Sequence, residues 1–255
     1  PRDLLIEIGT EELPPKALSA LAEAFEQGIR AGLEKAGLAT GAIQGFATPR
    51  RLAVLLEQLP TRQPDRPLER RGPALSAAFG PDGNPTKAAE GFARSCGVAV
   101  ADLQRRETDK GAWLVHLSVE PGAATVALIP SIVETALAGL PIPKRMRWGD
   151  RDDEFVRPVQ WVVLLFGDEV IPATILGVAA GRETHGHRFH RPQPIRLTAP
   201  ADYARQLTSE GQVIADFAAR RAAIRAQAEA VATELRGVAV IKSALLDEVT
   251  ALVEW

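Results

Sequence analysis

The 255-residue sequence is poor in sulfur and in aromatic rings, with one cysteine, one methionine and 5% aromatic residues. Cys96 alone allows no intramolecular disulfide, and a cytoplasmic location is the simplest expectation. Apolar runs such as residues 161–166 fall far short of the roughly 20 residues that a membrane-spanning helix needs. An acidic residue comes before any long apolar stretch, so we expect neither a secretory signal nor a transit peptide.

An excess of either charge sign is also missing. The 30 basic and 32 acidic side chains leave a formal net charge of −2, which excludes a basic nucleic-acid tail. The chain is 46% hydrophobic and 24% charged, a composition typical of a packed globular protein. A chain of this length buries enough surface for a real core.

Three signatures of self-contained catalysis are absent from the sequence. It holds no G-x-x-x-x-G-K-[ST] loop, no G-x-G-x-x-G turn and no G-x-S-x-G elbow. We therefore expect no nucleotide-handling enzyme complete in itself, and we assign no catalytic residue.

The opening predicts a β-α-β unit. Residues 4–8 are typical of a short strand, and residues 51–56 of a second one. Between them, apolar residues at steps of three and four indicate one face of a helix. These are Leu18, Leu21, Phe25, Ile29 and Leu33.

The rest of the chain predicts an α+β protein with a mixed or antiparallel sheet in the middle and a helical C-terminal part. Six prolines between residues 60 and 85 favour a linker or extended loop. Helices are expected over 86–94, with Thr86 as N-cap, and over 125–140. Strands are expected over 112–117, 145–148, 159–166 and 170–178, with turns at Gly149 and Gly167.

After Pro200 a helical stripe predicts a packing face, formed by Ile214, Phe217, Ile224, Ala228, Val231 and Leu235. The expected segments are 1–64 (N-terminal β-α-β unit), 65–110 (Pro-rich loop and small helical appendage), 111–200 (mainly β, with one helix) and 201–255 (helical).

Three of the four histidines lie close together at His185, His187 and His190. On a strand, His185 and His187 would share a face and His190 would lie on the other, with no nearby cysteine or acid in a ligand pattern. We therefore expect no metal site here, and a polar strand or turn instead. A hydrolase that uses this cluster, free-standing or of the editing type, stays open as an alternative.

Two basic clusters permit a nucleic-acid interpretation. One is Arg50 with Arg51, and the other is Lys144, Arg145 and Arg147 before Trp148. Their functional interpretation is phosphate contact plus a stacking aromatic on RNA. Spacing alone favours a solvated edge with one core-facing row.

Whole phrases of the sequence resemble one family. In order they are residues 5–15 (LIEIGTEELPP), 48–53 (TPRRLA), 85–92 (PTKAAEGF), 143–149 (PKRMRWG), 155–159 (FVRPV), 186–189 (GHRF) and 248–255 (EVTALVEW). None is a generic motif. Together they resemble the N-terminal part of the bacterial glycyl-tRNA synthetase β subunit.

The resemblance implies several expectations. The family's chain continues through an HD-type domain and an anticodon-binding domain, so the sequence is expected to be an N-terminal fragment. ATP-dependent glycine activation belongs to the separate α subunit, so the fragment alone should hold no cofactor and be inactive. Two α and two β subunits form a heterotetramer that charges glycine tRNA in the cytoplasm, away from membranes. The tRNA-binding candidates are Arg50, Arg51, Lys144, Arg145, Arg147, Arg157, His187 and Arg188.

Overall fold

The computed structural model describes residues 1–108, 111–150 and 152–255. These residues form two compact units. The core unit comprises Pro1–Arg62 and Ala123–Trp255, and the inserted unit comprises Gln63–Gly122. This division differs from the four consecutive segments expected from the sequence, because the strand that begins at Gly111 pairs with strands of the preceding fifty residues.

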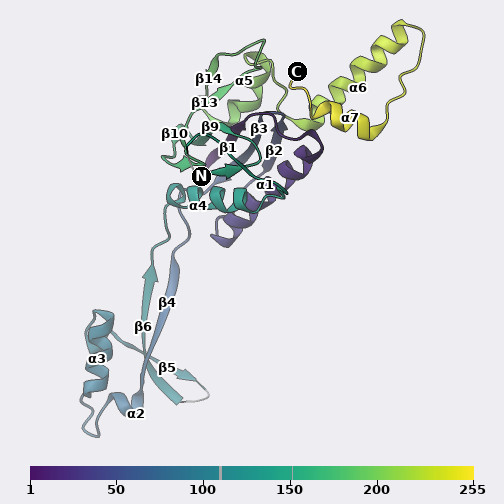
Figure 1. Ribbon diagram of the computed structural model, residues 1–255. Coiled ribbons are helices and arrows are strands. Elements are labelled where there is room, and N and C mark those ends of the chain that lie inside the picture. Colours follow the sequence, from purple (N-terminus) through teal and green to yellow (C-terminus); the bar gives the residue numbers. More distant parts are fainter. Residues whose placement is uncertain (109–110, 151) are drawn as a thin grey trace. The chain divides into compact units, whose positions relative to one another are not determined.

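A seven-stranded sheet forms the centre of the core unit (Figure 1), in the order β11-β12-β9-β1-β3-β2, with β10 also paired to β9. Neighbouring strands run antiparallel except β12 and β9, which are parallel. The strands are β1 (Arg2–Thr10), β2 (Ile43–Thr48), β3 (Arg51–Leu59), β9 (Val159–Phe166), β10 (Glu169–Val170), β11 (Thr174–Ile175) and β12 (Val178–Gly181). The α+β class expected from the sequence is confirmed.

Both faces of this sheet are covered, which explains why β1 and β9 are apolar along nearly their whole length. Even-numbered residues of β1, such as Leu4 and Ile6, join the core beneath α1 (Leu18–Lys35) and α4 (Thr125–Ala138). Odd-numbered residues such as Leu5 face α5 (Tyr203–Ser209) on the other side. Glu7 lies on this second face, and its carboxylate is the centre of the polar site described below.

The opening contains one strand more than the expected β-α-β unit. The helix is present, and its five predicted apolar residues are all buried. After Gly37, with φ of 69°, the chain forms β2 and turns directly into β3, which pairs antiparallel with β2 on one side and with β1 on the other. The sequence hides β2 because residues 43–48 include Gln44 and Gly45, which disfavour a strand.

The expected single strand over 170–178 is instead three short ones, β10, β11 and β12. Pro172 cannot donate a ladder hydrogen bond, and Leu176 and Gly177 turn the chain with φ of 47° and 75°. The turns predicted at Gly149 and Gly167 are confirmed, with φ of 63° and 61°. Two small sheets complete the core unit: β7 (Met146–Arg147) with β8 (Glu154–Phe155), and β13 (Glu183–His185) with β14 (Pro194–Arg196).

The inserted unit is a three-stranded antiparallel sheet of order β4-β6-β5 with helices on it. It comprises β4 (Arg66–Ala74), α2 (Leu75–Ala78), α3 (Lys87–Cys96), η2 (Val100–Asp102), β5 (Gln104–Thr108) and β6 (Gly111–Glu120). The proline-rich stretch expected to be a loop therefore contains a strand. β4 is an edge strand, where proline is tolerated. The N-cap at Thr86 is confirmed, since its side chain accepts a hydrogen bond from the backbone N–H of Ala89.

The helical C-terminal part comprises η3 (Pro200–Asp202), α5, α6 (Phe217–Glu234) and α7 (Ser243–Thr250), and η1 (Pro15–Ala17) precedes α1. The predicted packing face along α6 is wrong over its second half. Val231 is 53% and Leu235 77% exposed, and Ala228 is exposed too. The buried side chain of α6 is Arg220 in its first turn. No helix among the described residues is long and apolar enough to cross a membrane.

Candidate functional site

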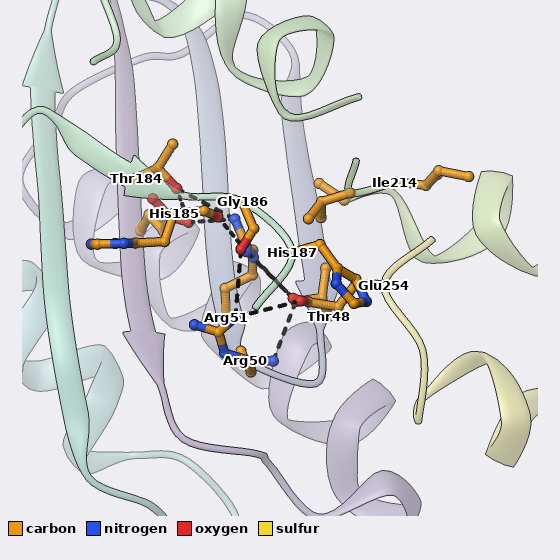
Figure 2. A network of polar contacts seen from close by, with 12 residues as sticks. Thr48, Arg50, Arg51, Thr184, His185, Gly186, His187, Ile214 and Glu254 are labelled. Carbon is orange, nitrogen blue, oxygen red and sulfur yellow. Dashed lines mark hydrogen bonds and ion pairs between the residues drawn. The ribbon is translucent and has the colours of Figure 1, made fainter. Parts of the chain in front are cut away.

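The face of the sheet beneath α5 contains a buried ion pair. Glu7 in β1 and Arg51 at the start of β3 are both 0% exposed, and Arg51 Nη1 lies 3.2 Å from Glu7 Oε1. Burying a charged pair costs desolvation free energy, which further hydrogen bonds to the two charged groups offset. We call Glu7, Thr48, Arg51, Thr184, Tyr203 and Glu254 the core ion network. Figure 2 labels four of its members, Thr48, Arg51, Thr184 and Glu254.

Arg51 uses all five of its N–H donors within this network. In addition to its bond with Glu7, Arg51 donates from Nε to Thr48 Oγ1 at 3.1 Å and from Nη1 to Thr184 Oγ1 at 3.3 Å. Its Nη2 donates to the His185 carbonyl at 2.8 Å and to Glu254 Oε1 at 3.3 Å. Burial alone would lower the pKa of Arg51, but the carboxylates of Glu254 and Glu7 more than offset it, so the pKa is raised. Arg51 is therefore a fully engaged cation.

Glu7 is held by two hydroxyl groups as well as by Arg51. Thr184 Oγ1 donates to its Oε1 at 2.8 Å and Tyr203 Oη at 3.0 Å. Burial raises the pKa of Glu7 above its ordinary value, against the opposing effect of the Arg51 charge. Burial and the neighbouring Glu7 charge raise the pKa of Tyr203 well above its ordinary value, so the phenol stays a donor.

The segment around Glu254 is tied into the same network. Glu254 is 5% exposed, and its Oε1 accepts a hydrogen bond from Thr48 Oγ1 at 2.7 Å. Its backbone carbonyl accepts from the N–H of Ile214 at 2.7 Å. Arg50 Nη1 lies 3.7 Å from Glu254 Oε2 and donates to the Gly186 carbonyl at 3.5 Å. Figure 2 shows these residues of distant segments pointing toward one another.

Trp161 lies against both arginines of this site. The Arg50 and Arg51 guanidinium carbons are 5.5 and 5.6 Å from its ring centroid, within cation–π range. The ring occupies the space where a side chain at Gly9 would lie, since a Cβ there would collide with it. Glycine at this position of the first resembling phrase therefore lets the Trp161 ring pack directly on β1.

The histidine segment borders the network. The His187 Nδ1 accepts hydrogen bonds from the N–H groups of Phe189 and His190, both at 3.3 Å. Burial lowers the pKa of His187, and burial together with the Arg50 and Arg51 charges lowers the pKa of His185. Among the described residues, no three His, Cys, Asp or Glu side chains form a group able to hold a metal ion.

Two further predicted cations pair with carboxylates on the surface. Arg188 contacts Glu11 at 2.5 Å and Glu12 at 2.7 Å. Arg147, whose side chain is 62% exposed, contacts Glu154 at 2.9 Å and Asp152 at 3.4 Å. Exposed pairs of this kind contribute little stability and are screened by salt.

The other three predicted cations, Lys144, Arg145 and Arg157, line one cavity of about 410 Å³. Within the described part of the chain, no carboxylate oxygen lies within 4.0 Å of their charged groups. Arg145 donates to backbone carbonyls of Leu137, Ala138 and Glu154, and Arg157 to those of Glu12 and Val156. The eight remaining lining residues are apolar: Pro14, Ala17, Leu21, Pro141, Ile142, Pro143, Met146 and Val156. We call this site the cation-lined cavity.

The structure thus sorts the eight predicted residues into three groups. Arg51 is buried in the core ion network, so its expected place on the surface is wrong, and Arg50 is nearly buried beside it, with its side chain 13% exposed. Arg147 and Arg188 are paired on the surface, and His187 accepts backbone hydrogen bonds. Only Lys144, Arg145 and Arg157 meet in one cavity.

Sequence reasoning missed five members of the network: Glu7, Thr48, Thr184, Tyr203 and Glu254. Glu7 carried a signal, because a lone acid inside the apolar run at residues 4–8 requires a buried partner. Thr184 and Glu254 carried none, since threonine and glutamate are common on any surface. The network also joins three of the resembling phrases, which contribute Glu7, Arg51 and Glu254 to one place.

Comparison with known proteins identifies the family. Residues 4–255 match the family model described as glycyl-tRNA synthetase beta subunit. The chain is 57% identical over 254 residues to the glycine–tRNA ligase beta subunit of Hahella chejuensis, covering 100% of this chain and 37% of that protein. It is 56% identical over 255 residues to that of Marinobacter nauticus, with the same two shares. The chain thus spans little more than a third of the length of these relatives, and it belongs to the glycyl-tRNA synthetase beta subunit family.

Proposed function

We propose that this chain is a binding portion of the beta subunit of a glycine–tRNA ligase. It contributes tRNA positioning and subunit assembly to the ATP-dependent attachment of glycine to its tRNA, with adenylate formation on the alpha subunit. The working assembly is a heterotetramer of two alpha and two beta subunits. The names of the relatives and the family match over residues 4–255 support this proposal.

The observation that carries the tRNA role is the set of three cations without carboxylate partners. Lys144, Arg145 and Arg157 stand together with their positive charge not neutralised by any carboxylate of the described chain. Phosphate oxygens are the natural anions for such groups, and guanidinium forks suit them geometrically. Arg147 and Arg188 extend this surface by exchanging their present carboxylates for phosphates.

The core ion network has a different role in the proposal. All five Arg51 donors are in use, and Glu7 and Arg51 are fully buried. A network of this kind fixes β1, β3 and the segment near Glu254 relative to one another. We therefore assign it a structural role within the chain and not a contact with RNA.

Binding of the glycine tRNA to the 255-residue chain tests the proposal. Lys144→Ala and Arg157→Ala should each weaken binding and make the plot of log affinity against log salt shallower, by about 0.9 for each phosphate that the variant no longer neutralises. Lys87→Ala, a change of an exposed lysine in the inserted unit, is the control and should change neither quantity. Unaltered affinity and salt slope in all three variants would refute the RNA-facing surface.

The assembly role is tested separately with the purified alpha subunit. The chain should bind it without tRNA present, and the tRNA-binding variants should retain that binding. The alternative of a hydrolase built on His185, His187 and His190 has no geometric observation in its favour among the described residues, since the His187 Nδ1 accepts backbone hydrogen bonds from Phe189 and His190.

A further inference from the structure

We propose that the cation-lined cavity binds a single nucleotide, with the base in its apolar interior and the phosphate on its cations. This inference deepens the proposed function and rests on it, because the nucleotide would be an unpaired residue of the bound RNA. Neither the predicted function nor the comparisons assign a ligand to this cavity.

The cavity has two apolar walls from distant parts of the core unit. One is formed by Pro14, Ala17 and Leu21, where η1 passes into α1. The other is the Pro141–Ile142–Pro143 segment that follows α4. Its volume of about 410 Å³ falls in the range of sites for small ligands. Proline, with its fixed backbone and ring, keeps such walls rigid without an aromatic side chain.

The two arginines are held in place by groups that leave their charge uncompensated. Arg145 Nη2 donates to the Ala138 carbonyl at 3.1 Å, at the end of α4. Arg157 Nε donates to the Glu12 carbonyl at 2.9 Å, and its Nη1 to the Val156 carbonyl at 3.0 Å. Neutral carbonyls restrain the guanidinium groups without cancelling their charge, so less entropy is lost when an anion binds.

This combination fits a nucleotide better than it fits other ligands. A purely apolar ligand would leave three cations unused, and a free inorganic anion would leave the apolar walls exposed. A nucleotide satisfies both, since its base offers apolar faces and its phosphate accepts charge-assisted hydrogen bonds. The apolar side chains of the lining cannot read base edges, so binding should discriminate weakly between bases.

The position of the sole methionine provides a direct readout. Met146 is the only methionine in the sequence and lines the cavity. A chain labelled with ¹³C at the methionine methyl group would therefore report occupancy by NMR. The ligands are AMP, adenosine, inorganic phosphate and a short single-stranded RNA, each titrated separately. AMP and the RNA should shift the Met146 signal, and adenosine and phosphate should do so much more weakly.

Two variants and one control test the assignment. Ala17→Trp fills the cavity and should weaken AMP binding at least about tenfold, and Lys144→Ala should weaken it by a smaller factor. Lys16→Ala changes an exposed neighbour that does not line the cavity and should leave AMP affinity unchanged. Ala17→Leu serves in place of Ala17→Trp if the larger side chain prevents folding, which thermal melting reports.

The outcomes separate this inference from the function beneath it. A shift with AMP and RNA supports a nucleotide of the RNA as the occupant, and a shift with AMP alone supports a free nucleotide. The pocket is refuted if no nucleotide shifts Met146, if Ala17→Trp binds AMP normally, or if only an acidic peptide shifts the signal. If Lys144→Ala weakens tRNA binding while Ala17→Trp binds tRNA as well as the parent chain, the RNA-facing surface is supported and the nucleotide site in the cavity is refuted.

Discussion

Replacing a buried arginine should lower the free energy of unfolding more than replacing an exposed one, and Arg51 is the buried case. Arg51→Lys would keep the charge but leave most of five acceptors without a donor, because an ammonium group cannot reproduce the fork. We expect the free energy of unfolding to fall by at least about 1–3 kcal/mol, the cost of leaving one buried polar group without its hydrogen bond. Urea denaturation of the chain measures this.

Arg188→Lys provides the matched control. Arg188 also faces two carboxylates, but its side chain is 38% exposed. The same substitution there should change stability by less than about 1 kcal/mol. Equal decreases at the two positions would show that burial does not set the importance of Arg51.

His187 predicts a dependence of stability on pH. Its folded-state pKa lies below 6.5, chiefly through burial. Below pH 6.5 the unfolded chain therefore binds the proton more readily than the folded one, and stability falls as the pH falls. Protonation would also remove Nδ1 as the acceptor for Phe189 and His190. The pKa of His185 is shifted in the same direction, so its contribution has the same sign.

The test compares the parent chain with the His185→Gln, His187→Gln double variant by urea denaturation at about pH 5.5 and about pH 7.5. The parent should lose more stability than the variant on acidification. Burial raises the pKa of Glu7, so its contribution to the pH dependence has the opposite sign above pH 4.5, but Glu7 is common to both chains. A decrease as large in the variant as in the parent would contradict the assignment.

At the residue scale, the sequence indicated which side chains bind anions better than it indicated which anions they meet. The pattern around Arg50 and Arg51 allowed either phosphate contacts or a solvated edge, and Arg51 instead meets buried carboxylates of the same chain. Phosphates and carboxylates present the same oxygen geometry to a guanidinium group, so the pattern itself does not distinguish them. The distinction depends on Glu254, which is 203 residues away in the sequence.

At the element scale, two helices of the core unit approach each other at a glycine. A Cβ at Gly28 in α1 would lie 2.9 Å from the Cβ of Ala136 in α4. Gly28→Leu should therefore force the helices apart and destabilise the fold by about 1–3 kcal/mol. Gly91, in α3, has open space at the same position. Gly91→Leu should instead stabilise the chain by about 0.5–1 kcal/mol through helix propensity.

Thermal and urea denaturation of both variants make the comparison. The comparison separates the effect of the helix–helix contact on stability from the effect of helix propensity, because both variants replace a helical glycine by leucine. Increased stability at both positions would mean that α1 and α4 tolerate the extra volume.

Periodicity predicted α1 correctly and α6 incorrectly, for one physical reason. A stripe of apolar residues identifies a helix and its apolar face, but not what covers that face. For α1 the cover is β1 and α4, and all five predicted residues are buried. For α6, Val231 and Leu235 stay exposed, and the first turn instead buries Arg220, whose Nη2 donates to the Ala47 carbonyl at 2.8 Å.

At the scale of the whole molecule, the connections were harder to predict than the elements. The inserted unit interrupts the core unit between Arg62 and Ala123, so the strands on either side of it are close in space but distant in sequence. β6 was correctly predicted as a strand. The boundary of the inserted unit, however, is set by the pairing of β6 with β4 and β5, and local strand propensity does not indicate which strands pair. For the same reason, the sequence did not predict that Glu7, Arg51 and Glu254 contact one another.

The last prediction concerns catalysis by the chain alone. We expect the purified chain neither to form glycyl-adenylate nor to charge tRNA, because the proposed function places adenylation on the alpha subunit. The sequence gives a second reason for this expectation, since it contains neither a G-x-x-x-x-G-K-[ST] loop nor a G-x-G-x-x-G turn to hold the phosphates of ATP. Glycine-dependent exchange of pyrophosphate into ATP is the measurement, with the alpha subunit as positive control. Exchange by the chain alone, after contaminating synthetase has been excluded, would overturn the proposed division of labour. Exchange that requires the alpha subunit would support it.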